Sequence, residues 1–231
     1  MTTSRAEQVT TPDGTFTAHC AVPDQPGPGI LLFQEIFGIN DNMRGLADRL
    51  AREGYVLLVP DVFWRIEPGF ERKDESALQE CMEMVGRLDW ATVPGDIVAT
   101  HEHLRSLPEC TGTVGAVGFC LGGTLTLLAA ASTPLDAAVS YYGSGNDQLL
   151  GRLDDVTCPV LFHYGDRDPF IPTESIEEVE RAVADRPAMR VERYDAGHAF
   201  SNWDAPSMYD EAAAQAAWSS TLAFLHQHLT P

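Results

Sequence analysis

Three residues able to form a nucleophilic triad occur in the order cysteine, aspartate, histidine: Cys120, Asp168 and His198. A thiol nucleophile needs a base to take its proton, and that base needs a partner that fixes its tautomer. We therefore predict that Cys120 attacks an acyl carbon, with His198 as the base and Asp168 as the residue that orients the imidazole.

The segment around the cysteine reads Gly118-Phe-Cys-Leu-Gly122, between a short apolar run and an apolar helix-like segment. This is the G-x-C-x-G form of a nucleophile elbow, a sharp strand-to-helix turn in which small residues avoid backbone clashes. At the start of the helix, the dipole and unpaired N–H groups favour a thiolate, and the Leu121 N–H can donate to an oxyanion. The alternative is a buried structural cysteine in a tight turn.

Two aspartates compete for the role of acid, because Asp166 and Asp168 both follow the apolar run Pro159–Tyr164. Asp168 precedes a proline-rich run that would hold its loop, whereas Asp166 resembles a turn residue that bonds its own backbone. We favour Asp168 and keep Asp166 as the alternative. His198 follows the last apolar run in a small, flexible turn, and its alternative is a surface-loop histidine.

Glu35 follows the strongly apolar run Gly29–Gln34. The loop at this position supplies the second N–H donor of the oxyanion hole in elbow enzymes, and here that donor is Ile36. A carboxylate beside a thiol disfavours the thiolate by like-charge repulsion. Glu35 is therefore predicted to keep Cys120 neutral until a substrate arrives, and the alternative is a strand-end glutamate that faces water.

The elements that must position these residues alternate along the chain. Strands are predicted at Phe16–Val22, Gly29–Gln34, Tyr55–Val59, Val114–Phe119, Ala137–Tyr142, Pro159–Tyr164 and Arg190–Tyr194. Helices are predicted at Asn42–Arg52, Glu75–Leu88, Pro94–Ser106, Leu121–Ala131, Glu174–Ala184 and Ser207–His228. Several strands lack polar alternation, which favours an α/β fold, a doubly wound, mostly parallel sheet with helices on both faces. Ligands bind beyond the carboxyl ends of such strands, and Val62–Asp74 is expected to form a loop over that edge.

Composition sets further bounds. The 231 residues suit one α/β domain spanning 1–231. A net charge of −19 disfavours nucleic acid and membrane partners, which need clustered Lys and Arg. No signal-peptide pattern and no apolar run of about 20 residues occurs. Five cysteines without a C-x-x-C pair fit a reduced compartment, so a cytoplasmic location is predicted and the oligomeric state stays open.

No cofactor or metal is predicted. No G-x-x-x-x-G-K-[ST] or G-x-G-x-x-G pattern follows a predicted strand. His101-Glu-His103 and His226-Gln-His228 hold alternate histidines, which point to different faces of a helix and so do not form a ligand pair. These histidines are expected on the surface.

Four motifs together resemble the dienelactone hydrolase family of α/β-hydrolases. They are Gln34-Glu-Ile-Phe-Gly38, Gly118-Phe-Cys-Leu-Gly-Gly123, His163-Tyr-Gly165 with Asp168 and Pro172, and Ala196-Gly-His-Ala-Phe200. The order of nucleophile, acid and histidine also fits that fold. The resemblance implies a triad of Cys120, Asp168 and His198 that cleaves a lactone or ester through an acyl-thioester. It also implies that Glu35 gates the thiol and that Ile36 and Leu121 donate to the oxyanion.

The resemblance has two departures. The family carries a carboxylate-binding arginine four residues after the catalytic histidine, where this chain has Asn202, and a second one near Leu78, where only Arg72 and Lys73 are close. A bidentate arginine contact is not replaced by asparagine without loss. The possible substrate contacts are Phe37, Tyr142, Asn202, Arg72 and Lys73.

The predicted partner is therefore a small-molecule ester or lactone, hydrolysed without a cofactor. Two alternatives remain. The first is a hydrolase of another acyl substrate, such as a simple carboxylic ester or a thioester. The second is a non-catalytic protein that uses the fold as a binding scaffold, because a fold alone does not establish activity.

Overall fold

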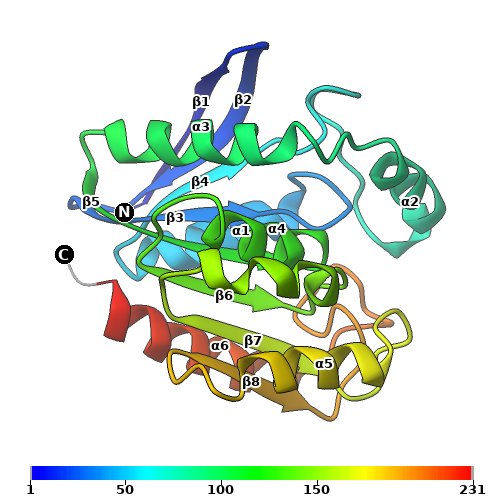
Figure 1. Cartoon of the computed structure of the whole chain (residues 1–231). Coiled ribbons are helices and arrows are strands. Elements are labelled where there is room, and N and C mark those ends of the chain that lie inside the picture. Colours follow the sequence, from blue (N-terminus) through cyan, green and yellow to red (C-terminus); the bar gives the residue numbers. More distant parts are fainter. Residues whose placement is uncertain (1, 230–231) are drawn as a thin grey trace.

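The computed structural model describes residues 2–229 and contains one eight-stranded sheet (Figure 1). The strands are β1 (Thr3–Thr11), β2 (Gly14–Val22), β3 (Gly27–Phe33), β4 (Val56–Pro60), β5 (Cys110–Phe119), β6 (Ala137–Tyr141), β7 (Val160–Gly165) and β8 (Met189–Tyr194). Their spatial order is β1-β2-β4-β3-β5-β6-β7-β8. β1 pairs antiparallel with β2, and β2 with β4, whereas every other neighbouring pair is parallel.

Helices cover both faces of this sheet. They are α1 (Asp41–Arg52), α2 (Leu78–Gly86), α3 (Val93–Ser106), α4 (Leu121–Ala130), α5 (Thr173–Val183) and α6 (Glu211–His228), with 3-10 helices η1 (Glu75–Ala77) and η2 (Asn146–Asp155). In Figure 1, α3, α4 and α5 lie in front of the sheet and α1 and α6 lie behind it. Arg49 of α1 stacks over Trp218 of α6, which places these two helices side by side. The predicted doubly wound architecture is thus confirmed.

Burial explains the continuous apolar strands. Every residue of β3, β4, β6 and β7 is buried. A strand covered by helices on both faces has no solvent-facing side, so it shows no polar alternation. The apolar face of α1 packs in the same way, since Met43, Leu46 and Leu50 are buried.

The structure also contains elements that the pattern did not predict. Strand β1 reads Thr-Ser-Arg-Ala-Glu-Gln-Val-Thr-Thr and is mostly exposed, because it is an antiparallel edge strand whose hydrogen bonds need little apolar surface. The helix predicted at Glu75–Leu88 is divided into η1 and α2. The last helix begins at Glu211 rather than Ser207, since the Asp210 carboxylate accepts a hydrogen bond from the Ala213 N–H at 3.0 Å and caps it there.

Within residues 2–229, no helix is long and apolar enough to span a membrane, and no group of three metal-ligating side chains is assembled. The expectation of surface histidines is wrong for His101, which is buried in α3. His103 instead contacts Glu7, with the ring Nε2 3.1 Å from a carboxylate oxygen.

Candidate active site

Cys120 lies at a strained turn between β5 and α4. Its backbone has φ 54° and ψ −117°, a conformation that non-glycine residues rarely adopt. A Cβ atom on Gly118 would lie 2.0 Å from the Gly122 carbonyl oxygen, and one on Gly122 would lie 2.2 Å from the Phe33 carbonyl oxygen. Both glycines are therefore needed for the turn to form against β3, as the elbow pattern requires.

Backbone strain is concentrated at this site. Within the described part of the chain, the non-glycine residues with positive φ are Cys120, Tyr142 and Ala199. Tyr142 directly follows β6, where its N–H donates to the His163 carbonyl at 2.7 Å, and Ala199 directly follows His198. Such conformations persist only where the surrounding structure enforces them, and they cluster at functional sites.

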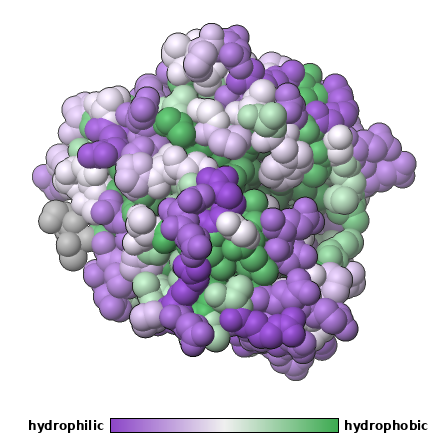
Figure 2. Space-filling view, in the orientation of Figure 1, coloured by the Kyte–Doolittle hydropathy of each residue, from purple (hydrophilic) through white to green (hydrophobic). Residues whose placement is uncertain are grey.

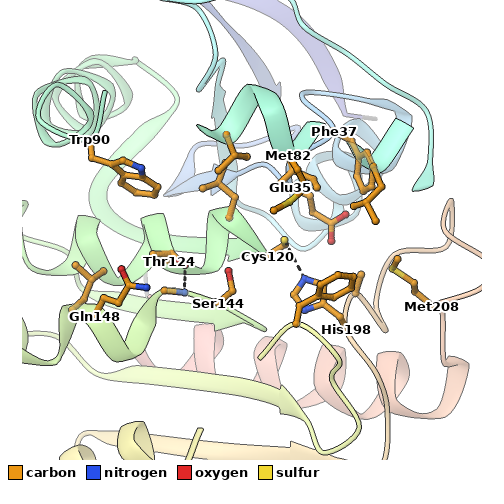
Figure 3. Close-up of a pocket in the computed structure, with 18 residues that line it drawn as sticks. Glu35, Phe37, Met82, Trp90, Cys120, Thr124, Ser144, Gln148, His198 and Met208 are labelled. Atoms are coloured by element: carbon orange, nitrogen blue, oxygen red, sulfur yellow. Dashed lines mark hydrogen bonds between the residues drawn. The ribbon is translucent and has the colours of Figure 1, made fainter. Parts of the chain in front are cut away.

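His198 joins the thiol to the acid. Its Nε2 lies 3.1 Å from the Cys120 Sγ, the contact drawn as a dashed line in Figure 3, and its Nδ1 lies 2.7 Å from the Asp168 Oδ2. The ring is buried, and Phe170 packs edge-on against it at 5.2 Å between centroids. The two ring nitrogens thus have separate partners, as a proton-transferring histidine requires.

Asp168 is held by its own loop. Its side chain is 1% exposed, and its Oδ1 accepts hydrogen bonds from the Phe170 N–H at 2.8 Å and the Ile171 N–H at 3.0 Å. The second oxygen is left to face His198. Asp166, the alternative acid, is exposed and bonds the Arg193 Nε at 2.5 Å instead. The structure therefore brings Asp168, and not Asp166, to the histidine.

The electrostatics of His198 favour its charged form. Burial by itself lowers the pKa of the ring, but the charge of Cys120 and the hydrogen bond to Asp168 outweigh burial, so the pKa of His198 is raised. The imidazole can therefore hold a proton taken from the thiol, which leaves an imidazolium between a thiolate and a carboxylate.

Glu35 is 3% exposed and lines the same cavity as Cys120. The Tyr142 hydroxyl donates to its Oε1 at 3.2 Å, and the Asn202 side-chain amide donates to its Oε2. Burial raises the pKa of Glu35, and the charge of His198 and these two hydrogen bonds oppose that effect. Among residues 2–229, the partners of the carboxylate are Tyr142 and Asn202, and it makes no hydrogen bond to the thiol.

The predicted oxyanion donors, Ile36 and Leu121, both line the cavity. Leu121 is the first residue of α4, so its N–H has no acceptor one turn earlier in the helix. The N–H groups of Gly123 and Thr124 bond back to the Cys120 carbonyl, at 2.9 and 3.3 Å. Within the described chain, no protein acceptor takes the N–H of Ile36 or Leu121.

A cavity of about 450 Å³ opens beside the thiol, a volume typical of small-molecule sites. Its lining is largely apolar, and Figure 2 shows hydrophobic surface in the hollowed part of this face, near the region where Figure 1 places α2. The lining residues are Glu35, Ile36, Phe37, Leu78, Met82, Val85, Trp90, Cys120, Leu121, Thr124, Ser144, Gly145, Gln148, Leu149, Phe170, His198, Ala199 and Met208.

Only some of the predicted substrate contacts line the cavity. Phe37 lines the cavity, whereas Tyr142 and Asn202 are buried outside its lining and contact Glu35. Both ends of the Asn202 amide have a protein partner, since its Oδ1 also accepts the Asp204 N–H at 3.0 Å. Asn202 therefore acts on the carboxylate and does not face the open cavity.

The two predicted cations also lie outside the lining. The Arg72 Nε bonds a Glu80 carboxylate oxygen at 2.7 Å, and its guanidinium lies 4.4 Å from the centre of the Phe70 ring. Lys73 is exposed and is absent from the cavity lining. Both residues lie at the end of the long loop Val62–Asp74, where Glu80 and Phe70 hold the Arg72 side chain.

The apolar wall formed by α2 was not predicted from the sequence. Leu78, Met82 and Val85 line the cavity, and Trp90 follows shortly after the helix. Their spacing of four and three residues is the signal of one helix face, which is usually buried in a core. Nothing in that spacing distinguishes a face that packs on the sheet from one that covers a cavity.

Comparisons with known proteins agree with this geometry. The family model described as "Dienelactone hydrolase family" matches residues 16–229. The chain is 36% identical over 206 residues to a carboxymethylenebutenolidase of Pseudomonas sp. strain P51, covering 88% of this chain and 87% of the relative. It is 35% identical over 206 residues to that of Pseudomonas putida, covering 87% of each.

Solved structures show the same likeness. A Klebsiella pneumoniae structure classed with the dienelactone hydrolases superposes with a TM-score of 0.86 at 29% identity, covering 98% of this chain and 99% of that one. With the family match over most of its length and these relatives, the chain belongs to the dienelactone hydrolase family.

Proposed function

We propose that this hydrolase cleaves a small ester or lactone with Cys120 as the nucleophile and an acyl-thioester as the intermediate. The observation that carries the proposal is the continuous contact from Cys120 Sγ through His198 to Asp168, with lengths of 3.1 and 2.7 Å. The names of the relatives also point to a lactone as one substrate of the family.

In the first half of the reaction, the Cys120 proton moves to His198 Nε2 and the sulfur attacks the carbonyl carbon. A C–S bond forms, and the carbonyl electron pair moves onto oxygen, where the N–H groups of Ile36 and Leu121 stabilise the negative charge. When the carbonyl reforms, the C–O bond to the leaving group breaks. His198 gives its proton to that oxygen, and an alcohol leaves.

In the second half, water takes the place of the alcohol. His198 accepts a proton from the water as it attacks the thioester carbonyl, and Asp168 holds the imidazolium that forms. The C–S bond then breaks and releases a carboxylic acid, and the sulfur takes the proton back from His198 to restore the thiol. A lactone would follow the same steps, with the alcohol and the acid on one product molecule.

Alkylation followed by peptide mass mapping tests the nucleophile. Cys20, Cys81 and Cys158 are buried, and burial raises the pKa of each thiol to about 11. One equivalent of iodoacetamide is therefore expected to label Cys120 first and to abolish ester turnover in proportion. Brief exposure to p-nitrophenyl acetate should place an acetyl group on the same peptide. Full turnover by protein carrying a labelled Cys120 would contradict the proposal.

Glu35→Gln is expected to stabilise the protein at neutral and alkaline pH and to speed alkylation of Cys120. Burial raises the pKa of Glu35 above its ordinary 4.5, so the folded protein holds this proton more tightly than the unfolded chain. The stability of the parent relative to the variant is therefore greatest at low pH, where Glu35 is protonated. This relative stability falls as the pH rises above 4.5 and through the raised pKa of Glu35. A tenfold difference in proton affinity between the folded and unfolded chain corresponds to about 1.4 kcal/mol of stability.

Thermal unfolding from pH 4 to 9 and the iodoacetamide rate measure both effects. A glutamine can accept the Asn202 N–H and donate to the Tyr142 oxygen, so the contacts survive while the charge is lost. Glu177→Gln, on the exposed face of α5, is the matched control and should change neither quantity. A variant whose stability relative to the parent is independent of pH would refute the assignment of a buried charge to Glu35.

A further inference from the structure

We propose that the cavity accepts an uncharged ester or lactone whose acyl part is apolar and extended, in preference to one that carries a carboxylate. This inference rests on the proposed function above. Its first support is the cavity lining, which within the described chain contains no lysine or arginine and has Glu35 as its carboxylate. A substrate carboxylate would enter that cavity without a lysine or arginine to pair with, and both ring nitrogens of His198 are already engaged by Cys120 and Asp168. Burying a charge without a partner is costly in a largely apolar site.

Two of the three cations of the loop before α2, Arg65 and Arg72, are already paired. The Arg65 Nη2 lies 2.8 Å from an Asp96 carboxylate oxygen, and its Nη1 lies 2.9 Å from an Asp13 carboxylate oxygen. Arg72 bonds Glu80. A net charge of −19 adds a long-range repulsion for anions. An anionic substrate that recruited Arg65 or Arg72 would therefore have to break an existing ion pair, and Lys73 is exposed and lies outside the cavity lining.

The second support is the apolar character of the cavity's rim. Met82 is 54%, Trp90 45% and Phe170 48% exposed, and all three line the cavity. Large apolar side chains left open to water together usually mark a binding site. Met82 and Trp90 extend the apolar wall formed by α2, which provides surface for more than a small acyl group, whereas Phe170 packs against His198.

The position of His198 decides which part of the substrate meets this surface. The leaving oxygen must lie within hydrogen-bond reach of His198 Nε2 to receive its proton. In Figure 3, Trp90 and Gln148 lie at the end of the cavity away from His198, with Thr124 and Cys120 between them. The acyl chain therefore extends from Cys120 toward Trp90, and the leaving group lies on the His198 side.

A series of p-nitrophenyl esters with one leaving group tests this arrangement. The acetate, butanoate and hexanoate esters differ in acyl length, and each methylene that becomes fully buried is expected to raise kcat/KM about fourfold. We expect kcat/KM to rise at least about tenfold from acetate to hexanoate. The monoester of adipic acid replaces the terminal methyl of hexanoate by a carboxylate, and its kcat/KM should fall about tenfold or more below that of hexanoate.

The methyl ester of that adipate separates charge from polarity. It is uncharged and of similar length, so its kcat/KM should lie near that of hexanoate if charge is what the cavity rejects. Trp90→Ala should lower kcat/KM for hexanoate several-fold more than for acetate. Tyr209→Ala, which removes an exposed aromatic outside the cavity lining, is the matched control and should not change that ratio.

A gain of charge supplies the converse test. Leu78 lines the cavity on the first turn of α2, so Leu78→Arg would place a guanidinium there. This variant is expected to raise the adipate-to-hexanoate ratio of kcat/KM at least about tenfold, because the new cation can pair with the carboxylate. Leu78→Gln adds polarity without charge and should leave the ratio close to that of the parent.

The outcomes separate this inference from the proposed function. Turnover that depends on Cys120 but treats adipate monoester and hexanoate equally would overturn the substrate preference and leave the nucleophile in place. A kcat/KM that is flat from acetate to hexanoate would overturn the apolar acyl site. Absence of turnover and of any acyl adduct on Cys120 with every ester would overturn the proposed function, and this inference with it.

Discussion

Cys120→Ala is expected to lower kcat/KM for p-nitrophenyl esters by about 10⁴-fold or more, the scale seen when a covalent nucleophile is removed. The side chain forms the bond to the acyl group, so no neighbour can replace it. Cys120→Ser should also lose most of the activity, because a hydroxyl is a far weaker nucleophile and the raised pKa of His198 depends on the charge at sulfur.

The two variants separate chemistry from folding. Serine and alanine are both small enough for the turn at Cys120, so near-parent unfolding temperatures are expected. Cys110→Ser, at the start of β5 and outside the cavity lining, is the matched control and should keep activity within about twofold of the parent, as for substitutions away from a site. A Cys120→Ser variant as active as the parent would contradict thiolate attack.

His198→Gln is expected to lower kcat/KM by about 10³-fold or more, since both proton transfers pass through Nε2. The variant is also expected to slow the alkylation of Cys120 by iodoacetamide. At pH 6.5 the parent should react with iodoacetamide much faster than the variant, because the histidine takes the thiol proton. At pH 9.5 the difference should shrink, since a free thiol ionises there without a partner.

Glutamine retains a donor near Asp168 and fills similar space, so the loss reports proton transfer more than packing. His103→Gln removes a histidine that contacts Glu7 outside the cavity, and it should leave both rates unchanged. Equal alkylation rates of parent and His198→Gln at pH 6.5 would mean that the 3.1 Å contact between His198 and the sulfur has no role in activating it.

Local sequence determined the elbow. Glycines two residues either side of Cys120 are required by contacts within the turn and with β3, so the pattern is visible without the rest of the fold. The buried parallel strands are visible for a similar reason, because helices on both faces demand continuous apolar runs. Edge strand β1 was missed because its pairing with β2 uses backbone hydrogen bonds that leave no apolar pattern.

Tertiary structure decided the rest of the site. Asp168 and His198 lie on separate loops after β7 and β8, and the parallel order of the strands brings them to Cys120 at one edge of the sheet. Their residue types and order were visible in the sequence. The choice of Asp168 over Asp166 depended on loop contacts that only the folded chain makes.

By itself, the sequence determined the turn at Cys120, the chain order of Cys120, Asp168 and His198, and the layered α/β fold, because each depends on local spacing or on burial along one element. Only the tertiary structure decided the charge and shape of the cavity. Arg72 lies near the site in sequence but pairs with Glu80, while Leu78 and Trp90 line the cavity. The partner of a long charged side chain is set by whatever packs beside it, and sequence spacing does not report that.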